Sequence, residues 1–137
     1  MIKINSDYIK LFSYYILAIL SIFIYGIYRC SNPQYKDPLE NKIPIINLEY
    51  IDGWSLSHLL FFIFIGYQCV GDCKDTTYLT ITFIGGTLWE LFEYYYGKEK
   101  YGKFGVWDCN NLTTDKETEN WWYAKYSDIF INAIGLI

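Results

Sequence analysis

Two long uncharged runs constrain this chain more than any other feature of its sequence. Leu11 to Tyr28 contains 18 residues and Gly53 to Gly71 contains 19, and neither run includes Asp, Glu, Lys or Arg. At a rise of about 1.5 Å per residue, a helix of either length covers most of a hydrocarbon layer about 30 Å thick. Both runs therefore predict helices that span a membrane.

The composition of the whole chain agrees with this prediction. The chain has 137 residues, enough for one domain, and 53% of them are hydrophobic and 21% aromatic, unlike an ordinary soluble domain. The net charge is −4 and the acidic residues are mixed with lysines, so no basic stripe suited to DNA or RNA is present. The charge distribution therefore argues against nucleic acid as a partner, and the composition predicts a lipid environment.

Four hydrophobic segments can be placed along the chain. We predict an all-α fold, a polytopic transmembrane bundle of about four helices that forms a single integral membrane domain over residues 1–137. The predicted helices cover residues 8–28, 53–71, 76–97 and 121–137, with polar loops at 29–52 and 98–120. All three prolines fall in the first loop, where one short extended piece is expected at Ile43 to Leu48. The bilayer is then the main partner, and assembly into an oligomer is compatible with this arrangement.

The two ends of the chain leave alternatives open. Lys3 and Lys10 precede the first run as in a signal peptide, but no small-residue cleavage site stands before Arg29, which favours an uncleaved anchor. The last segment, Trp121 to Ile137, is barely long enough to cross. It either ends at the far headgroups or belongs to a truncated form of a longer chain.

The distribution of basic residues predicts an orientation. Eight lie in or close to the two large loops, against three on the other side, and the positive-inside rule then places both loops in the cytoplasm; the eight are Arg29, Lys36, Lys42, Lys98, Lys100, Lys103, Lys116 and Lys125, and the three are Lys3, Lys10 and Lys74. A glycosylated Asn111 or a Cys30–Cys109 disulfide would require the reverse orientation. Free thiols are the default interpretation of the four cysteines, which lack paired zinc-ligand spacing.

Four ionisable residues lie inside the predicted helices, where a charge at the membrane centre costs about 2.5–3.5 kcal/mol on insertion scales. They are His58, Glu90, Glu93 and Asp128, and with antiparallel helices all four lie roughly 6–10 Å below one membrane face. Helical spacing puts Asn132 on the face of Asp128, and small residues such as Gly86 on the same faces would let the helices approach closely. This polar cluster is the candidate catalytic site.

The residue types of the cluster are compatible with two kinds of chemistry. A histidine with two or three carboxylates could bind a divalent cofactor such as Mg, Mn or Zn, with His58, Glu90, Glu93 and Asp128 as candidate metal ligands. Crowded carboxylates would equally serve a proton relay. The structural alternative is that Glu93 and Asp128 reach the interface while His58 is a neutral packing residue.

The same residues resemble two groups of small bacterial membrane proteins. One is the VanZ-like group, whose pattern would correspond here to Asp52, His58, Glu90, Glu93, Asp128, Asn132 and Gly135. The other is an uncharacterised integral-membrane family, which Ser57-His58, Trp89-Glu90-Leu91-Phe92-Glu93 and Ser127-Asp128 resemble. This chain has Phe61 and Tyr94 where the second family tends to have a further His and Asn. The resemblance implies a fold and a site location rather than an activity.

Three functional hypotheses follow. In the first, the cluster acts on a lipid or lipid-linked substrate, with His58, Glu90, Glu93 and Asp128 as metal ligands or as general acids and bases. In the second, the chain is a non-catalytic assembly or scaffold component whose cluster fixes helix packing. A proton-coupled transporter is the third, but four short spans leave little room for alternating access without an oligomer.

Overall fold

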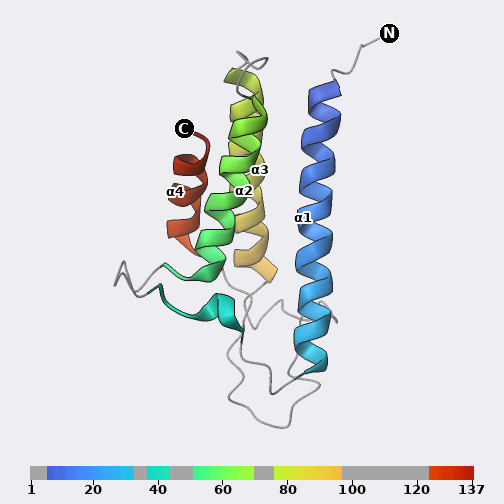
Figure 1. Ribbon diagram of the computed structural model, residues 1–137, viewed down its shortest axis with the longest axis vertical. Helices are drawn as coiled ribbons and strands as arrows, with labels where there is room; N and C mark the ends of the chain where they lie inside the picture. Colours follow the sequence, from blue (N-terminus) through green and yellow to red (C-terminus); the bar gives the residue numbers. More distant parts are fainter. Residues whose placement is uncertain (1–5, 33–36, 44–50, 70–75, 97–123) are drawn as a thin grey trace.

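A computed structural model of the chain describes residues 6–32, 37–43, 51–69, 76–96 and 124–137, and these residues are almost entirely helical (Figure 1). The helices are α1 (Ser6–Ser31), the 3₁₀ helix η1 (Pro38–Glu40), α2 (Gly53–Cys69), α3 (Thr76–Tyr96) and α4 (Tyr126–Gly135). Extended pairing within these ranges is limited to an isolated antiparallel bridge between Lys42 and Asp52. The predicted all-α class is therefore confirmed.

The helix bounds differ most from the prediction at the C-terminal segment. α4 begins at Tyr126 rather than at Trp121, because Lys125 is extended, with φ −120° and ψ 128°. In this conformation the Lys125 N–H donates to Glu90 Oε2 at 3.3 Å instead of entering a helix. Trp121, Asn111, Cys109, the Cys30 side chain and most of the extended piece expected at Ile43 to Leu48 lie outside the described residues.

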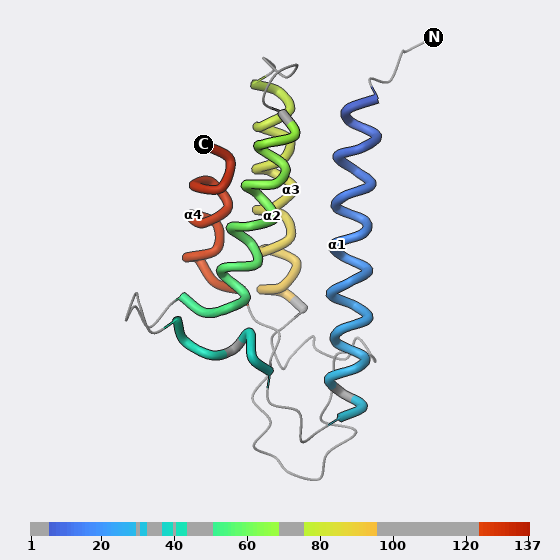
Figure 2. The backbone as a smooth tube through the Cα atoms, viewed as in Figure 1, coloured from blue at the N-terminus to red at the C-terminus, as the bar shows by residue number. Residues whose placement is uncertain are grey.

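Helices α2, α3 and α4 pack together, with α4 against α2 on the side away from α1 (Figure 2). α1 reaches this group through aromatic side chains. Tyr15 Oη donates to the Thr82 carbonyl oxygen at 2.5 Å, and the Tyr14 ring meets Phe64 edge-on at a centroid distance of 5.1 Å. Gly85 leaves room for the Tyr15 ring, since a Cβ there would lie 3.0 Å from it. The tyrosines of α1 thus attach it to the other helices.

Small residues permit the close approach of α2 and α4, as the sequence pattern predicts. A Cβ on Gly135 would lie 2.8 Å from the Phe62 Cβ and 2.9 Å from the Leu59 carbonyl oxygen. A Cβ on Gly66 would lie 3.3 Å from the Gly135 carbonyl oxygen. The two backbones are therefore nearly in contact at these glycines, which fixes how far α4 can slide along α2.

Replacing Gly135 by valine is expected to destabilise the protein by about 1–3 kcal/mol, the usual cost of overpacking a close contact. The added atoms would meet the Leu59 carbonyl oxygen, which is backbone and cannot rotate away. Unfolding in detergent, followed by circular dichroism, measures the change. The neighbouring Ile134→Val is the control, because Ile134 is 64% exposed and should tolerate the change; equal stability of the two variants would refute the close-contact account.

A buried carboxylate joins α1, η1 and α2 at one end of the bundle. Asp37 accepts hydrogen bonds from Tyr25 Oη at 2.6 Å and from the Leu39 N–H at 2.8 Å. It also accepts from Arg29 Nη1 at 2.7 Å and from Trp54 Nε1 at 3.2 Å. Four donors from three elements converge on one side chain, which ties the C-terminal end of α1 to the N-terminal end of α2.

One described helix is long and apolar enough to cross a membrane, namely α1 over Ser6–Arg29, and a signal sequence near the N-terminus would meet the same criteria. α2 has 17 described residues, which makes a helix about 26 Å long. α4 has 10 residues, or about 15 Å, roughly half of a hydrocarbon layer. Among the described helices, α1 alone meets the criteria for a span, and the multi-pass topology stays a prediction.

Candidate functional site

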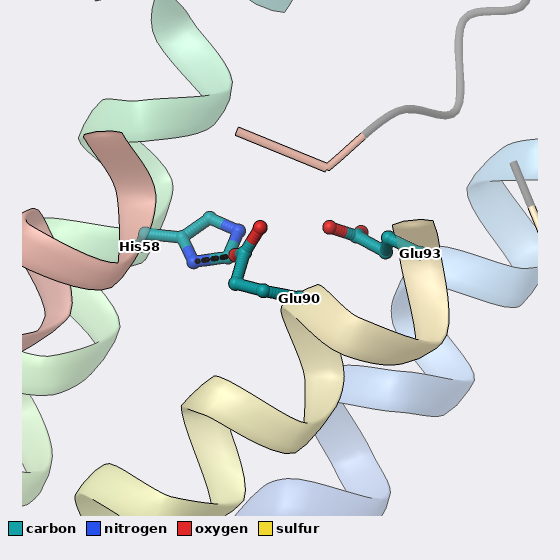
Figure 3. Close-up of side chains that lie close together, drawn as sticks. All are labelled: His58, Glu90 and Glu93. Atoms are coloured by element: carbon teal, nitrogen blue, oxygen red, sulfur yellow. Dashed lines mark ion pairs between the residues drawn. The ribbon is translucent and has the colours of Figure 1, made fainter. Parts of the chain in front are cut away.

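Three of the four predicted ionisable residues form one compact group between α2 and α3. One ligand-type atom each from His58, Glu90 and Glu93 lies within 4.8 Å of the others. Figure 3 shows the Glu90 and Glu93 carboxylates on the side of the imidazole ring that faces α3. Glu90 and Glu93 are three residues apart, and this spacing places both side chains on one face of α3, toward α2.

The His58 ring is held by two oxygen atoms. Nδ1 lies 3.1 Å from Asn132 Oδ1, a hydrogen-bond distance, and 3.4 Å from Glu90 Oε1. Both neighbours are acceptors, so the proton of a neutral imidazole belongs on Nδ1, which donates to Asn132. Nε2 then carries the lone pair, and Figure 3 shows this nitrogen on the side of the ring nearer Glu93.

Glu90 is the most buried member of the group, with 3% of its surface exposed. Its Oε2 accepts the Lys125 N–H at 3.3 Å, which orients the carboxylate from the start of α4. Its Oε1 is buried and accepts no hydrogen bond from the part of the chain that the structure describes. A buried carboxylate oxygen without a donor is costly, so this atom favours a bound proton or cation.

Asp128 lies near the group but has its own contacts. Its Oδ1 accepts the Ser55 hydroxyl at 2.6 Å and the Ser127 hydroxyl at 3.4 Å. Asp128, Asn132 and Gly135 are the buried residues of α4, so the Asp-x-x-x-Asn-x-x-Gly spacing forms the face that α4 turns toward α2 and α3. Asp128 therefore lies on α4 one turn before Asn132, the residue that contacts His58, and is not itself a member of the His58–Glu90–Glu93 group.

Two further residues, Asp52 and Lys125, belong to this polar region; Asp52 is part of one of the resemblance patterns given above, but neither residue is among the predicted site residues. Asp52 Oδ1 accepts the Ser55 N–H at 3.0 Å, which caps the start of α2, and Asp52 Oδ2 forms an ion pair with Lys125 Nζ. Lys125 therefore contacts Asp52 with its side chain and Glu90 with its backbone. In the sequence, Lys125 stands out only as a lysine close to the start of an apolar segment, and this position predicts neither its contact with Asp52 nor its contact with Glu90.

The charges of the region are unevenly distributed. Glu90, Glu93 and Asp128 gather near a single imidazole, while the Lys125 ammonium is engaged with Asp52. Carboxylates at such short range repel one another unless a proton or a cation lies between them. The Glu90–Glu93 pair therefore has the electrostatic character of a proton-sharing or cation-binding site.

The group opens onto an apolar cavity of about 420 Å³. His58 and Glu93 are part of its wall, and its remaining wall comes mainly from aliphatic and aromatic side chains of α1, α2 and α3. The α1 residues that line it include Tyr15, Ala18, Ile19, Ile22 and Tyr25. A volume of this size falls within the range of small-ligand sites, which are typically apolar with a few polar groups.

Comparisons with known proteins assign no family to this site. The chain matches no protein-family model, and neither the curated proteins nor the solved structures include a significant match.

Proposed function

We propose that this chain is a multi-pass membrane protein that acts on a lipid or lipid-linked amphiphile, with its apolar part in the cavity and its polar group at His58 and Glu93. The observation that carries the proposal is the cavity itself, an apolar space of about 420 Å³ with an imidazole and a carboxylate in its wall. A purely polar substrate would make no apolar contacts with most of this wall. An amphiphile would place its apolar chain against the wall and its polar group beside the imidazole and the carboxylate.

The distribution of polar and apolar side chains supports the membrane setting. Large apolar residues are exposed on all four α-helices, for example Phe12 (59%), Leu60 (57%), Leu88 (58%) and Phe130 (71%). The fully buried positions include polar ones, among them Ser55, Thr82 and Asn132. An apolar exterior around a polar interior suits helices surrounded by lipid, because polar groups within a bilayer face the interior of the bundle.

Within this proposal the residues have distinct roles. His58 and Glu93 face the substrate, since both line the cavity. Glu90 Oε1 lies 3.4 Å from Nδ1 of the imidazole, and the contact with Asn132 fixes the orientation of the ring. Asp128 and Ser55 hold α4 in the position that keeps Asn132 beside His58.

Photo-crosslinking tests the amphiphile part of the proposal. Purified protein in lipid nanodiscs is incubated with a long-chain phospholipid that carries a diazirine in its acyl chain, and labelled residues are identified by mass spectrometry. We expect saturable labelling of cavity residues. Ala18→Phe should reduce it severalfold by filling the cavity, and Leu17→Phe should not, because Leu17 is 61% exposed and lies outside the cavity wall. Equal labelling of both variants would contradict the proposal.

Chemical action on the lipid requires a second readout. Lipid extracts of cells that express the wild-type chain should contain a modified lipid that is absent from cells without the chain. Extracts of cells that express His58→Ala should lack this lipid.

A scaffold protein is the alternative, and the close packing of α2 on α4 around Gly135 and Asn132 is the observation that favours it. For a scaffold, the lipid extracts would be identical, and His58→Ala would only lower stability or capture of an assembly component.

A further inference from the structure

The geometry of the polar group points to a metal site. We propose that His58, Glu90 and Glu93 together bind one divalent first-row transition-metal ion, with a coordination position left open toward the cavity. This goes beyond the proposed lipid chemistry, and metal binding is measurable without any substrate.

The spacing of the three side chains is the first observation. One ligand-type atom from each of the three residues lies within 4.8 Å of the other two. Two ligand atoms each about 2.1 Å from a tetrahedral ion lie roughly 3.4 Å apart. The observed group is wider than this by up to about 1.4 Å, so modest side-chain movement would bring the three donors to coordination spacing.

The buried oxygen of Glu90 is the second and independent observation. Glu90 is 3% exposed, and Oε1 accepts no hydrogen bond from any described residue, although Oε2 accepts the Lys125 N–H. A cation at this point would satisfy Oε1 and also relieve the repulsion between the Glu90 and Glu93 carboxylates. A proton shared between the two carboxylates is the alternative, and metal titration distinguishes the two.

The contact between His58 and Asn132 is the third observation. Metal-ligating histidines usually donate their other ring N–H to a carboxylate or carbonyl oxygen, which fixes the tautomer and the ring orientation. Here Nδ1 meets Asn132 Oδ1 at 3.1 Å, which leaves Nε2 as the metal-binding nitrogen. Asn132 is fully buried on α4. The imidazole of His58, a residue of α2, is therefore oriented by a residue of α4.

The donor set indicates the class of ion. One imidazole nitrogen with two carboxylates suits Zn²⁺, Mn²⁺, Fe²⁺ or Co²⁺ better than Mg²⁺ or Ca²⁺, which prefer oxygen ligands alone. Three protein ligands also leave room for a water or substrate oxygen, and His58 and Glu93 both face the cavity from which it would come.

Cobalt binding tests the proposal. Full-length protein in detergent is stripped with a chelator and titrated with Co²⁺, whose visible spectrum reports binding and separates nitrogen and oxygen ligands from thiolates. We expect one ion per chain with a nitrogen/oxygen spectrum. Glu90→Gln and Glu93→Gln should each weaken binding at least 100-fold. Asn132→Leu should weaken it 10–100-fold, and Asn132→Asp should retain it because a carboxylate can also accept the Nδ1 proton.

Asp37→Asn is the matched control, because it also removes a buried carboxylate, but one that lies outside the His58–Glu90–Glu93 group and pairs with Arg29. It should keep the one-to-one stoichiometry and the wild-type spectrum. The proposal is overturned if the wild-type protein binds no stoichiometric Co²⁺, if the spectrum is that of thiolate ligands, or if Asp37→Asn and Glu90→Gln weaken binding equally. Circular dichroism of each variant establishes that it is folded.

Discussion

Replacing Asp37 by alanine is expected to lower the free energy of unfolding by about 3–5 kcal/mol, the usual cost of removing one member of a buried ion pair. The pair is buried, since the Asp37 side chain is 0% exposed and that of Arg29 is 14% exposed. The variant deprives Arg29, Tyr25 and Trp54 of a shared acceptor at once. Chemical unfolding in detergent, followed by tryptophan fluorescence, measures the loss.

Two controls separate burial from charge in this experiment. Asp7→Ala removes a carboxylate from an exposed pair on α1, the helix that carries Arg29; Lys10 Nζ lies 3.5 Å from it, and stability should change by no more than about 0.5 kcal/mol. Asp37→Asn retains an amide oxygen for the Leu39 N–H and should lose less than Asp37→Ala. If Asp37→Ala matches Asp7→Ala, Asp37 does not hold α1 to the rest of the bundle.

The consequence for the cavity follows from the same contacts. Tyr25, Leu39 and Trp54 line the cavity, and each also donates a hydrogen bond to Asp37. The carboxylate therefore fixes one end of the cavity wall, while the Tyr15 bond to Thr82 attaches α1 farther along. α1 contributes to the proposed function as a wall of the cavity, even though the polar group itself lies on α2 and α3.

The helices and the grouping of three candidate site residues could be predicted from the sequence because both depend on local patterns. Uncharged runs define helices within a few residues, and His58, Glu90 and Glu93 stand out because ionisable groups in apolar segments are costly. Antiparallel connection of neighbouring helices then brings them to one level. The structure agrees, with the three side chains within 4.8 Å of one another.

The supporting contacts could not be predicted, because they join residues far apart in the chain. The sequence predicts Asp128 near the other acids but does not identify its partner Ser55, which lies 73 positions away and meets it only through the packing of α4 against α2. Asp37 lies in a proline-containing loop, where no periodic pattern indicates which donors will meet it. Such contacts depend on the register between helices, which apolar periodicity does not specify.

Replacing Lys125 by methionine is expected to destabilise the protein by about 3–5 kcal/mol, because Asp52 then keeps its buried charge but loses the ammonium group that contacts Oδ2. Side-chain exposures of 16% for Lys125 and 6% for Asp52 place this pair in the interior. The backbone N–H of residue 125 remains and can still reach Glu90. Any loss therefore arises from the side chain and not from the bond that orients Glu90.

A double-mutant cycle distinguishes this coupling from a general loss of packing. Asp52→Asn combined with Lys125→Met removes both charges, keeps an oxygen for the Ser55 N–H that caps α2, and should recover about 0.5–3 kcal/mol relative to the sum of the single changes. Additive losses in chemical unfolding would show that the pair is not coupled. Because α4 also holds Asn132 against His58, recovery of stability should be accompanied by recovery of Co²⁺ affinity if the position of α4 controls the site.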